Sequence, residues 1–294
     1  MTPEQLNAWR IIPRLLMFAM IAMTYRTVEW FMSLPDPNPE QAALVSVMTG
    51  ALTGAFGLFL GKKRIMAELN VSLLPWQEEV FHDTTRFKVV AAGRRTGKSR
   101  LAAWLLIINA LQTEKGQVFY VAPTQGQARD IMWQTLMELG HPVIAGSHIN
   151  NLQIKLVNGT MISLKGADRP ETMRGVSLGF LVMDEYADMK PDVWEQILRP
   201  ALADQKGSAL FIGTPMGRNH FYELYKYAEL GDDETYKSWH FTSYDNSMLD
   251  SGEIDIAKKS MSSYAFRQEF MASFEARGSE MFKEDWVKFG FFFF

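Results

Sequence analysis

The sequence predicts an α/β protein with a doubly wound, mostly parallel sheet, preceded by a two-helix apolar hairpin. Short apolar runs at 87–92, 117–122, 180–183 and 209–212 each end at polar or turn-forming residues, as buried parallel strands do. The first run is followed by a glycine-containing turn and a long apolar helix over about 99–111. A strand, a glycine turn and a helix in this order form the repeating unit of such sheets.

An antiparallel addition to the sheet is indicated by Asn158-Gly159. This pair separates two segments of alternating polarity, 152–156 and 161–164. Asn-Gly between alternating segments is the strongest short-range signal for a β-hairpin. We therefore expect two antiparallel strands joined at Asn158-Gly159.

The first 65 residues differ in composition from the rest of the chain. Residues 11–34 are mostly apolar, and residues 42–61 carry no charge and are long enough to span a bilayer. Arginines precede the first stretch and Lys62-Lys63-Arg64 follow the second. The positive-inside rule then favours a transmembrane hairpin with cytoplasmic ends, anchored in the inner membrane. A buried soluble hairpin is the alternative interpretation.

The expected domain boundaries follow from two changes in composition. At Met66 a segment with the pattern of a soluble protein begins, so we expect a join between 1–65 and a core over 66–230. After about Gly231 strand signals fade and helical, aromatic-rich sequence takes over. We expect a lid or linker over 231–294.

Charge and cysteine content exclude several classes of protein. The 294 residues carry a net charge of -3, so any contact with nucleic acid must come from a local basic patch. The absence of cysteine excludes disulfides, zinc-thiolate sites and thiol nucleophiles, and it is consistent with a reducing cytoplasm. The five histidines have no metal-ligand spacing.

The turn after the first strand carries a phosphate-binding pattern, a P-loop (Walker A). It departs from G-x-x-x-x-G-K-[ST] in having Ala92 at the first glycine. In such a loop the glycine lets main-chain N–H groups face phosphate, the lysine reaches the β and γ oxygens, and the serine hydroxyl binds Mg²⁺. The expected ATP-binding residues are Gly93, Arg95, Thr96, Gly97, Lys98 and Ser99.

A second chemical signal (Walker B) is Asp184-Glu185, two acids at the end of the apolar run 180–183. Strand ends are where α/β proteins place their ligands. We expect Asp184 to hold the Mg²⁺ shell and Glu185 to polarise the attacking water, because phosphoryl transfer needs a positioned nucleophile. Taken alone, the two acids would equally suit the cap of a following helix.

Weaker signals point to the same chemistry. Gln77, which follows Trp76 about twenty residues before the loop, is placed to read adenine edges, although a surface glutamine is the simpler interpretation. Thr214 ends the next strand, where its hydroxyl could sense the γ-phosphate, or it belongs to an ordinary turn. Arg94 and Arg174 are candidates for charge stabilisation because guanidinium is permanently charged; solvated arginines are the alternative.

Taken together, these motifs resemble the large terminase subunit of tailed phages. They comprise Trp76-Gln77, 94–99, Thr172-Met173-Arg174-Gly175, Asp184-Glu185, Gly213-Thr214-Pro215 and 266–270. Arg94 three places before the Gly-Lys pair, without a first glycine, is characteristic of that family. Residues 1–65 weakly resemble a small holin-like phage membrane protein.

The terminase resemblance implies a RecA-like (ASCE) ATPase that translocates double-stranded DNA into a procapsid. It implies ATP and Mg²⁺ as cofactors, assembly into a ring, a portal protein and a small terminase subunit as partners, and the bacterial host cytoplasm as location. By the same resemblance Glu185 is catalytic, Thr214 couples hydrolysis to movement, and Arg94 and Arg174 are arginine-finger candidates.

The chain departs from the family at its C-terminus. Family members continue into an RNase H-like nuclease domain, but no clustered carboxylates follow Gly231, so DNA cutting is not expected. A helicase is a rival interpretation, yet about sixty residues after Gly231 do not supply a second RecA-like domain. A membrane-anchored lysis or interaction protein acting through residues 1–65 is the rival of a different class.

Overall fold

The computed structural model describes residues 11–61, 69–113 and 116–275 and divides into two compact units, Met1–Met66 and Ala67–Phe294. The basic residues Lys62-Lys63-Arg64 and the expected join at Met66 lie outside the described residues. The aromatic end of the chain beyond 275 lies outside them too.

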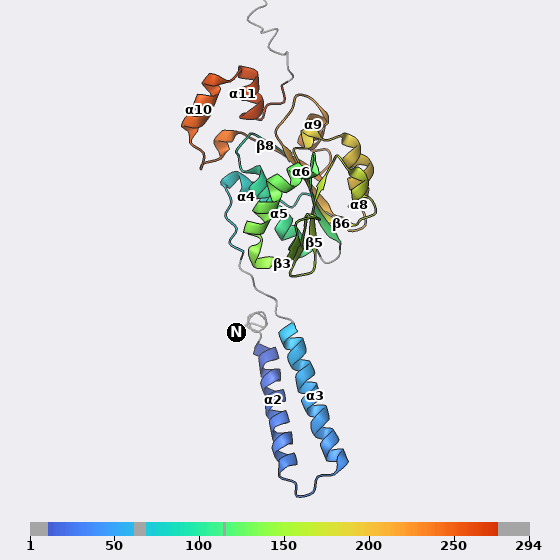
Figure 1. Ribbon diagram of the computed structural model, residues 1–294. Coiled ribbons are helices and arrows are strands. Elements are labelled where there is room, and N and C mark those ends of the chain that lie inside the picture. The colour runs from blue at the N-terminus through green and yellow to red at the C-terminus, as the bar shows by residue number, and fades with distance from the viewer. Residues whose placement is uncertain (1–10, 62–68, 114–115, 276–294) are drawn as a thin grey trace, which may run out of the picture. The chain divides into compact units, whose positions relative to one another are not determined.

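The first unit is a pair of helices, as the apolar stretches predict. Helix α2 spans Ile11–Met32 and helix α3 spans Pro39–Gly61 (Figure 1). Among the described residues, no helix combines the length and apolar character needed to cross a membrane, and this corrects the prediction of a transmembrane hairpin. Charge interrupts α2, where Arg26 and Glu29 form an exposed ion pair at 3.3 Å.

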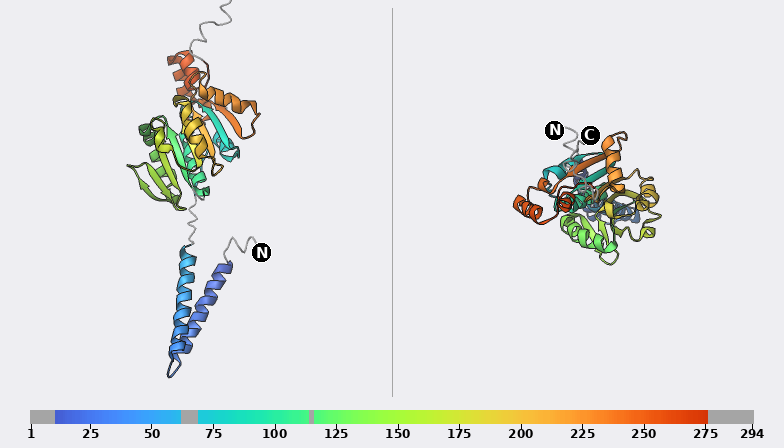
Figure 2. Two further views of the ribbon diagram at one scale, coloured as in Figure 1. Left: turned by 90° about the vertical axis from the view of Figure 1, so that its right-hand side faces the viewer. Right: turned by 90° about the horizontal axis from the view of Figure 1, so that it is seen from above.

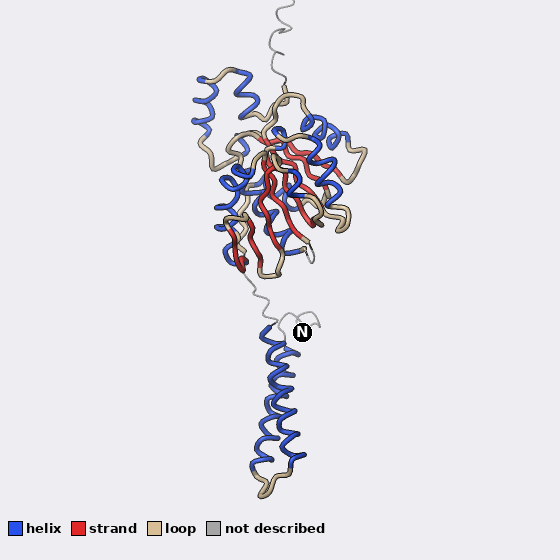
Figure 3. The backbone as a smooth tube through the Cα atoms, turned by 45° about the vertical axis from the view of Figure 1, so that its right-hand side comes forward, coloured by secondary structure: helices blue, strands red, loops and turns tan. Residues whose placement is uncertain are grey.

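The second unit is built on one sheet, shown in red in Figure 3. In the described part of the chain its order is β3-β4-β5-β2-β6-β7-β1-β8. The strands are β1 (Phe87–Ala92), β2 (Gln117–Ala122), β3 (Ile144–His148), β4 (Gln153–Leu156), β5 (Met161–Gly166), β6 (Leu178–Asp184), β7 (Ser208–Gly213) and β8 (Tyr236–Phe241). The neighbouring strands β5, β2, β6, β7, β1 and β8 pair in parallel. Strand β4 pairs antiparallel with both β3 and β5. The predicted fold class is confirmed.

Two local predictions about strands have opposite outcomes. Strands β4 and β5 pair antiparallel around Asn158-Gly159, where Gly159 has a φ of 92°, so the hairpin is confirmed. The expectation that strands end at Gly231 is wrong, because β8 pairs in parallel with β1. Strand β8 lies at the sheet edge and buries Trp239 while exposing Lys237 and His240. Its alternation of apolar and charged residues predicts a strand less clearly than the continuous apolar run of a central strand does.

Helices cover both faces of the sheet, as the two views of Figure 2 show. One face carries α4 (Pro75–His82), α5 (Lys98–Gln112), α6 (Gln125–Ala128), η1 (Arg129–Trp133) and α7 (Gln134–Leu139), with η2 (His141–Val143) following. The other carries η3 (Pro170–Met173), η4 (Tyr186–Asp188), η5 (Val193–Leu198), α8 (Arg199–Ala201) and α9 (His220–Leu230). The chain continues through η6 (Ser243–Asp245), α10 (Ser251–Ser260) and α11 (Ser263–Glu269).

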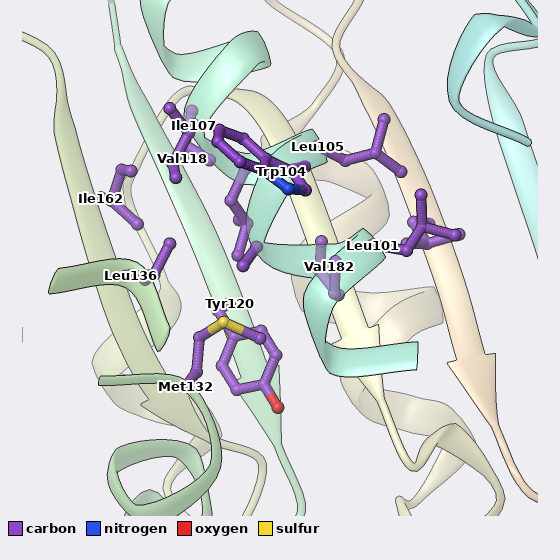
Figure 4. Packing of buried hydrophobic residues seen from close by; sticks show 14 of the residues in the cluster. Leu101, Trp104, Leu105, Ile107, Val118, Tyr120, Met132, Leu136, Ile162 and Val182 are labelled. Carbon is purple, nitrogen blue, oxygen red and sulfur yellow. The ribbon is translucent and has the colours of Figure 1, made fainter. Parts of the chain in front are cut away.

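Alternate strand residues supply the two cores. Tyr120 and Val182 pack with α5 in one core (Figure 4), which also contains Val90, while Val89 and Met183 belong to the core on the opposite face. This alternation is the period of two of a pleated strand. Because each buried large aliphatic side chain contributes about 1.5–3 kcal/mol, the central strands are held rigidly from both sides.

Sheet topology brings the predicted motifs together. Strands β6, β7 and β1 are consecutive neighbours and run parallel, so their carboxyl ends meet at one edge. The loop after β1, the acids at the end of β6 and Thr214 after β7 therefore converge there. This edge, where side chains from neighbouring strands gather, is the usual ligand site of open α/β sheets.

Candidate active site

The phosphate loop adopts a compact turn with two left-handed residues. Arg95 has a φ of 57° and Gly97 a φ of 98°. The Thr96 hydroxyl donates to the Gly93 carbonyl at 2.9 Å across the turn. A Cβ at Gly97 would lie 2.7 Å from Gln77 Nε2, so a larger residue would be strained by the left-handed backbone and would displace the Gln77 amide.

Helix α4 supports the loop from the N-terminal side. Trp76 Nε1 donates to the Thr96 carbonyl at 3.2 Å, and Gln77 Nε2 donates to the Gly97 carbonyl at 2.9 Å. Gln77 Oε1 accepts from the Leu74 N–H at 2.8 Å. The Gln77 side chain is 1% exposed, and both ends of its amide are engaged by main chain.

The segment from β8 to α11 supports the same loop from the other side. Ser243 Oγ donates to the Arg94 carbonyl at 2.7 Å, and Asn246 Nδ2 donates to the Arg95 carbonyl at 2.7 Å. The Arg94 N–H donates to the Glu269 carbonyl at 2.6 Å, and the two side chains form an ion pair. The carboxylate of Glu269 raises the pKa of Arg94 above its ordinary value.

Lys98 occupies the centre of the site. Its ammonium donates to the Thr214 hydroxyl at 2.8 Å and to the carbonyls of Ala92 and Gly93 at 3.1 and 3.3 Å. Glu185 Oε1 lies 3.8 Å from the Lys98 nitrogen. With 9% of its surface exposed, Lys98 is a buried cation whose charge is directed toward the loop and the acids.

The acidic pair has two unlike members. Asp184 is 2% exposed; its Oδ2 accepts from the Tyr120 hydroxyl at 2.6 Å and its Oδ1 from the Glu185 N–H at 2.9 Å. Burial, followed by repulsion from Glu185, raises the pKa of Asp184 to about 6. A nearby cation would lower this pKa again, because opposite charge favours the ionised carboxylate.

Glu185 is more exposed and lies between two motifs. Its φ of 52° is left-handed, a conformation that costs energy in a residue other than glycine and is common at functional sites. Glu185 Oε2 accepts from the Thr214 N–H at 3.1 Å. A Cβ at Gly213 would lie 3.1 Å from the Glu185 Cα, so the small residue at the end of β7 leaves room for the turn.

These groups border a cleft of about 450 Å³. Its lining residues are Arg94, Arg95, Thr96, Gly97, Lys98, Ser99, Arg100, Ile131, Asp184 and Glu185. The start of α5, whose helix dipole is positive there, adds to the charge of the arginines and Lys98. The cleft therefore suits a strongly anionic ligand bound together with a cation.

Most of the residues expected from the sequence gather in or beside this cleft. Gly93, Gln77 and Thr214 contact the lining residues through hydrogen bonds rather than by facing the cleft. Arg174 follows η3 on an exposed stretch and does not line the cleft. Within the described residues, no group of three or more His, Cys, Asp or Glu side chains is placed to hold a metal ion.

Sequence reasoning missed four residues that contact the site. They are Tyr120, Ser243, Asn246 and Glu269. Tyr120 lies within an apolar strand and gives no polar signal. The Glu269 position falls within the terminase-like segment 266–270, so that segment was the one available indication of a contact with the loop.

Sequence comparison identifies relatives of this part of the chain. Residues 89–289 match the family described as terminase large subunit, T4likevirus-type, N-terminal. The large terminase subunit of Escherichia phage T5 is 33% identical over 205 residues, covering 67% of this chain and 46% of the T5 protein. That of Thermus virus P23-45 is 28% identical over 169 residues, covering 51% and 35%. The chain spans less than half the length of these curated relatives.

Solved structures agree with the fold. The ATPase domain of the Thermus phage P74-26 large terminase is similar with a TM-score of 0.62 and 25% identity, covering 70% of this chain and 95% of that domain. A large terminase from a thermophilic bacteriophage, solved in complex with ADP, has a TM-score of 0.61 at 17% identity, covering 72% of this chain and 57% of that one. The second likeness supports the fold alone.

The resemblance drawn from the motifs is thereby confirmed. The family match begins within β1 and includes the phosphate loop, the acidic pair and the turn after β7. Because it extends over more than half of the chain, the protein belongs to the large terminase subunits of tailed phages and matches their ATPase domain.

Proposed function

We propose that this chain hydrolyses ATP to drive double-stranded DNA into a procapsid. The observation that carries the proposal is the meeting of Lys98, Glu185 and Thr214 at one sheet edge. Lys98 Nζ donates to Thr214 at 2.8 Å, and Thr214 N–H donates to Glu185 at 3.1 Å. A phosphate-binding cation and a water-positioning acid are thus joined through one threonine.

ATP with Mg²⁺ fits the donors and acceptors of the cleft. The loop N–H groups, Lys98 and the start of α5 suit phosphate oxygens, and the buried Asp184, with Ser99 on the same cleft wall, provides the hard oxygen ligands that Mg²⁺ prefers. Bound Mg²⁺ would neutralise charge on the β and γ phosphates. Asp184 and Ser99 would hold the ion.

Three side chains have distinct proposed roles. Lys98 leaves its loop carbonyls and Thr214 for the β and γ oxygens when nucleotide binds. Glu185 orients the water that attacks the γ-phosphate. Thr214 contacts both residues and would respond to the presence or loss of the γ-phosphate. Because Thr214 follows β7 directly, its displacement would move β7 and so couple hydrolysis to movement.

Two arginines are proposed to stabilise charge in different subunits. Arg94 lines the cleft of its own chain and is held by Glu269, so it would act in cis. Arg174 is exposed outside that cleft, so it would act on a neighbouring subunit in a ring. An arginine finger is worth roughly 10³ to 10⁵ in rate.

Family membership suggests the wider setting. We propose a ring at the portal protein, a small terminase subunit as partner and the bacterial host cytoplasm as location. We also propose that residues 66–230, completed by the edge strand β8, are the ATPase core and that the rest of 231–294 acts as a lid. The contacts of Ser243, Asn246 and Glu269 with the phosphate loop support that lid.

Two substitutions test the proposal. Lys98→Ala should abolish hydrolysis chiefly by weakening nucleotide binding, whereas Glu185→Gln should retain bound ATP without cleaving it, because only the water-positioning charge is lost. Nucleotide affinity and single-turnover hydrolysis are measured on both variants. An equal loss of binding in the two variants would contradict the assigned roles.

A further inference from the structure

Tyr120 reaches the acidic pair from a neighbouring strand. It lies on β2, which pairs with β6, and its hydroxyl donates to Asp184 Oδ2 at 2.6 Å. Figure 4 shows its ring beside Met132, with the hydroxyl oxygen turned away from the apolar side chains. Tyr120 is 0% exposed, so its hydroxyl is shielded from water in the folded protein.

The contact fixes a carboxylate that has few other restraints. The Glu185 N–H holds Asp184 Oδ1 at 2.9 Å, and Tyr120 holds the opposite oxygen. A carboxylate has about four acceptor positions, so two remain for other donors or a cation. With one donor on each oxygen, rotation about the last torsion of Asp184 is blocked and both remaining positions have a set direction.

We propose that Tyr120 is a positioning residue that orients Asp184 for the divalent cation accompanying the nucleotide. The inference rests on the proposed ATPase function and adds a residue to it. Tyr120 would not touch the cation, nucleotide or water. Partners that hold a metal ligand in place change metal affinity by roughly 10- to 100-fold when they are removed.

The hydroxyl matters more here than in an ordinary core tyrosine. Removing it leaves Asp184 Oδ2 without its donor in a site with 2% exposure, where water does not readily replace the bond. The carboxylate then gains rotational freedom, so binding the cation must supply the ordering that Tyr120 provides in advance. The loop residues that hold phosphate are untouched by this change.

Tyr120→Phe in the full chain tests the proposal. The affinity for a fluorescent ADP analogue is measured without divalent cation and across a Mg²⁺ titration, together with the Mg²⁺ dependence of hydrolysis. We expect cation-free ADP affinity to change less than about twofold and the Mg²⁺ concentration at half-effect to rise about 10- to 100-fold. At saturating Mg²⁺, the KM for ATP should return to the wild-type value.

Tyr225→Phe is the matched control. Tyr225 lies on α9 and its hydroxyl pairs with Ser238 and Glu229, not with Asp184 or Glu185, so its loss should leave the Mg²⁺ titration unchanged. Tyr120→Phe keeps the buried ring, and the cation-free ADP affinity measured on the same protein shows whether the variant is folded.

The outcomes separate this inference from the function on which it rests. Wild-type protein without Mg²⁺-dependent nucleotide binding would overturn the proposed ATPase. A wild-type Mg²⁺ response in folded Tyr120→Phe, or a matching shift in Tyr225→Phe, would overturn the role of Tyr120 alone. Equal weakening of ADP binding with and without Mg²⁺ would also overturn it, because that pattern indicates a disturbed loop.

Discussion

The substitution Gln77→Ala distinguishes support of the phosphate loop from recognition of adenine. In the structure the Gln77 amide donates to the Gly97 carbonyl at 2.9 Å and accepts from the Leu74 N–H at 2.8 Å. Both functions of the amide are therefore used by main chain. We therefore expect Gln77 to hold the loop closed rather than to read the base.

The magnitude follows from the two lost contacts. A neutral hydrogen bond contributes about 0.5–1.5 kcal/mol net, and a buried group left without a partner costs about 1–3 kcal/mol. Because Leu74 is only half-buried, we expect a loss near the lower end, about 2 kcal/mol. In a unit of this size that corresponds to a fall in Tm of about 4–8 °C.

Nucleotide binding should weaken without a change in base preference. If about 1 kcal/mol of the lost stability comes from the closed conformation of the loop, the affinity for nucleotide drops about fivefold. The drop should be equal for ATP and GTP. Thermal unfolding and competition binding with both nucleotides measure this, with the exposed Gln134→Ala as control. A loss confined to ATP, with unchanged Tm, would refute the supporting role and restore adenine recognition.

Three further predictions concern subunits, boundaries and chemistry. Arg174→Ala and Glu185→Gln should each fail to hydrolyse ATP alone, and mixing them should restore activity if Arg174 acts across an interface; near-normal hydrolysis by Arg174→Ala in rings would reject that role. A chain starting at Met66 should fold and bind ATP, measured by circular dichroism and nucleotide titration, because the second compact unit begins at Ala67; insoluble protein would count against the boundary. The purified chain should leave plasmid DNA uncut with Mg²⁺ or Mn²⁺, since two-metal hydrolysis needs clustered carboxylates; cleavage lost on substituting one of its carboxylates would show the opposite.

The parts of the fold that the sequence predicts are those encoded locally. Asn158-Gly159 specifies its hairpin because the turn and both strands are contiguous. The acids after 180–183 are recognisable because an apolar run stops at them. In each case the deciding interaction joins residues a few positions apart, so a short window contains the whole signal.

The parts that escape prediction depend on distant partners. Tyr120 and Asp184 are hydrogen-bonded but 64 positions apart in the sequence, and Ser243 and Arg94 are 149 positions apart. No local sequence pattern at either residue indicates its partner. Strand β8 has an alternation that fits a strand only once β1 is beside it. The helices at 11–32 and 39–61 were expected, but their environment was inferred from apolar composition, which helix-to-helix packing also produces.

The crowding at Gly93 has a consequence for the order in which the phosphate loop acquires its contacts. A Cβ there would lie 2.5 Å from the Phe270 carbonyl and 2.9 Å from Ser243 Oγ, so the glycine is required by a segment that is synthesised long after it. During translation the phosphate loop emerges well before these supports. A stretch of chain that contains the motif but ends before Ser243 and Phe270 therefore lacks the contacts that shape the loop in the folded protein.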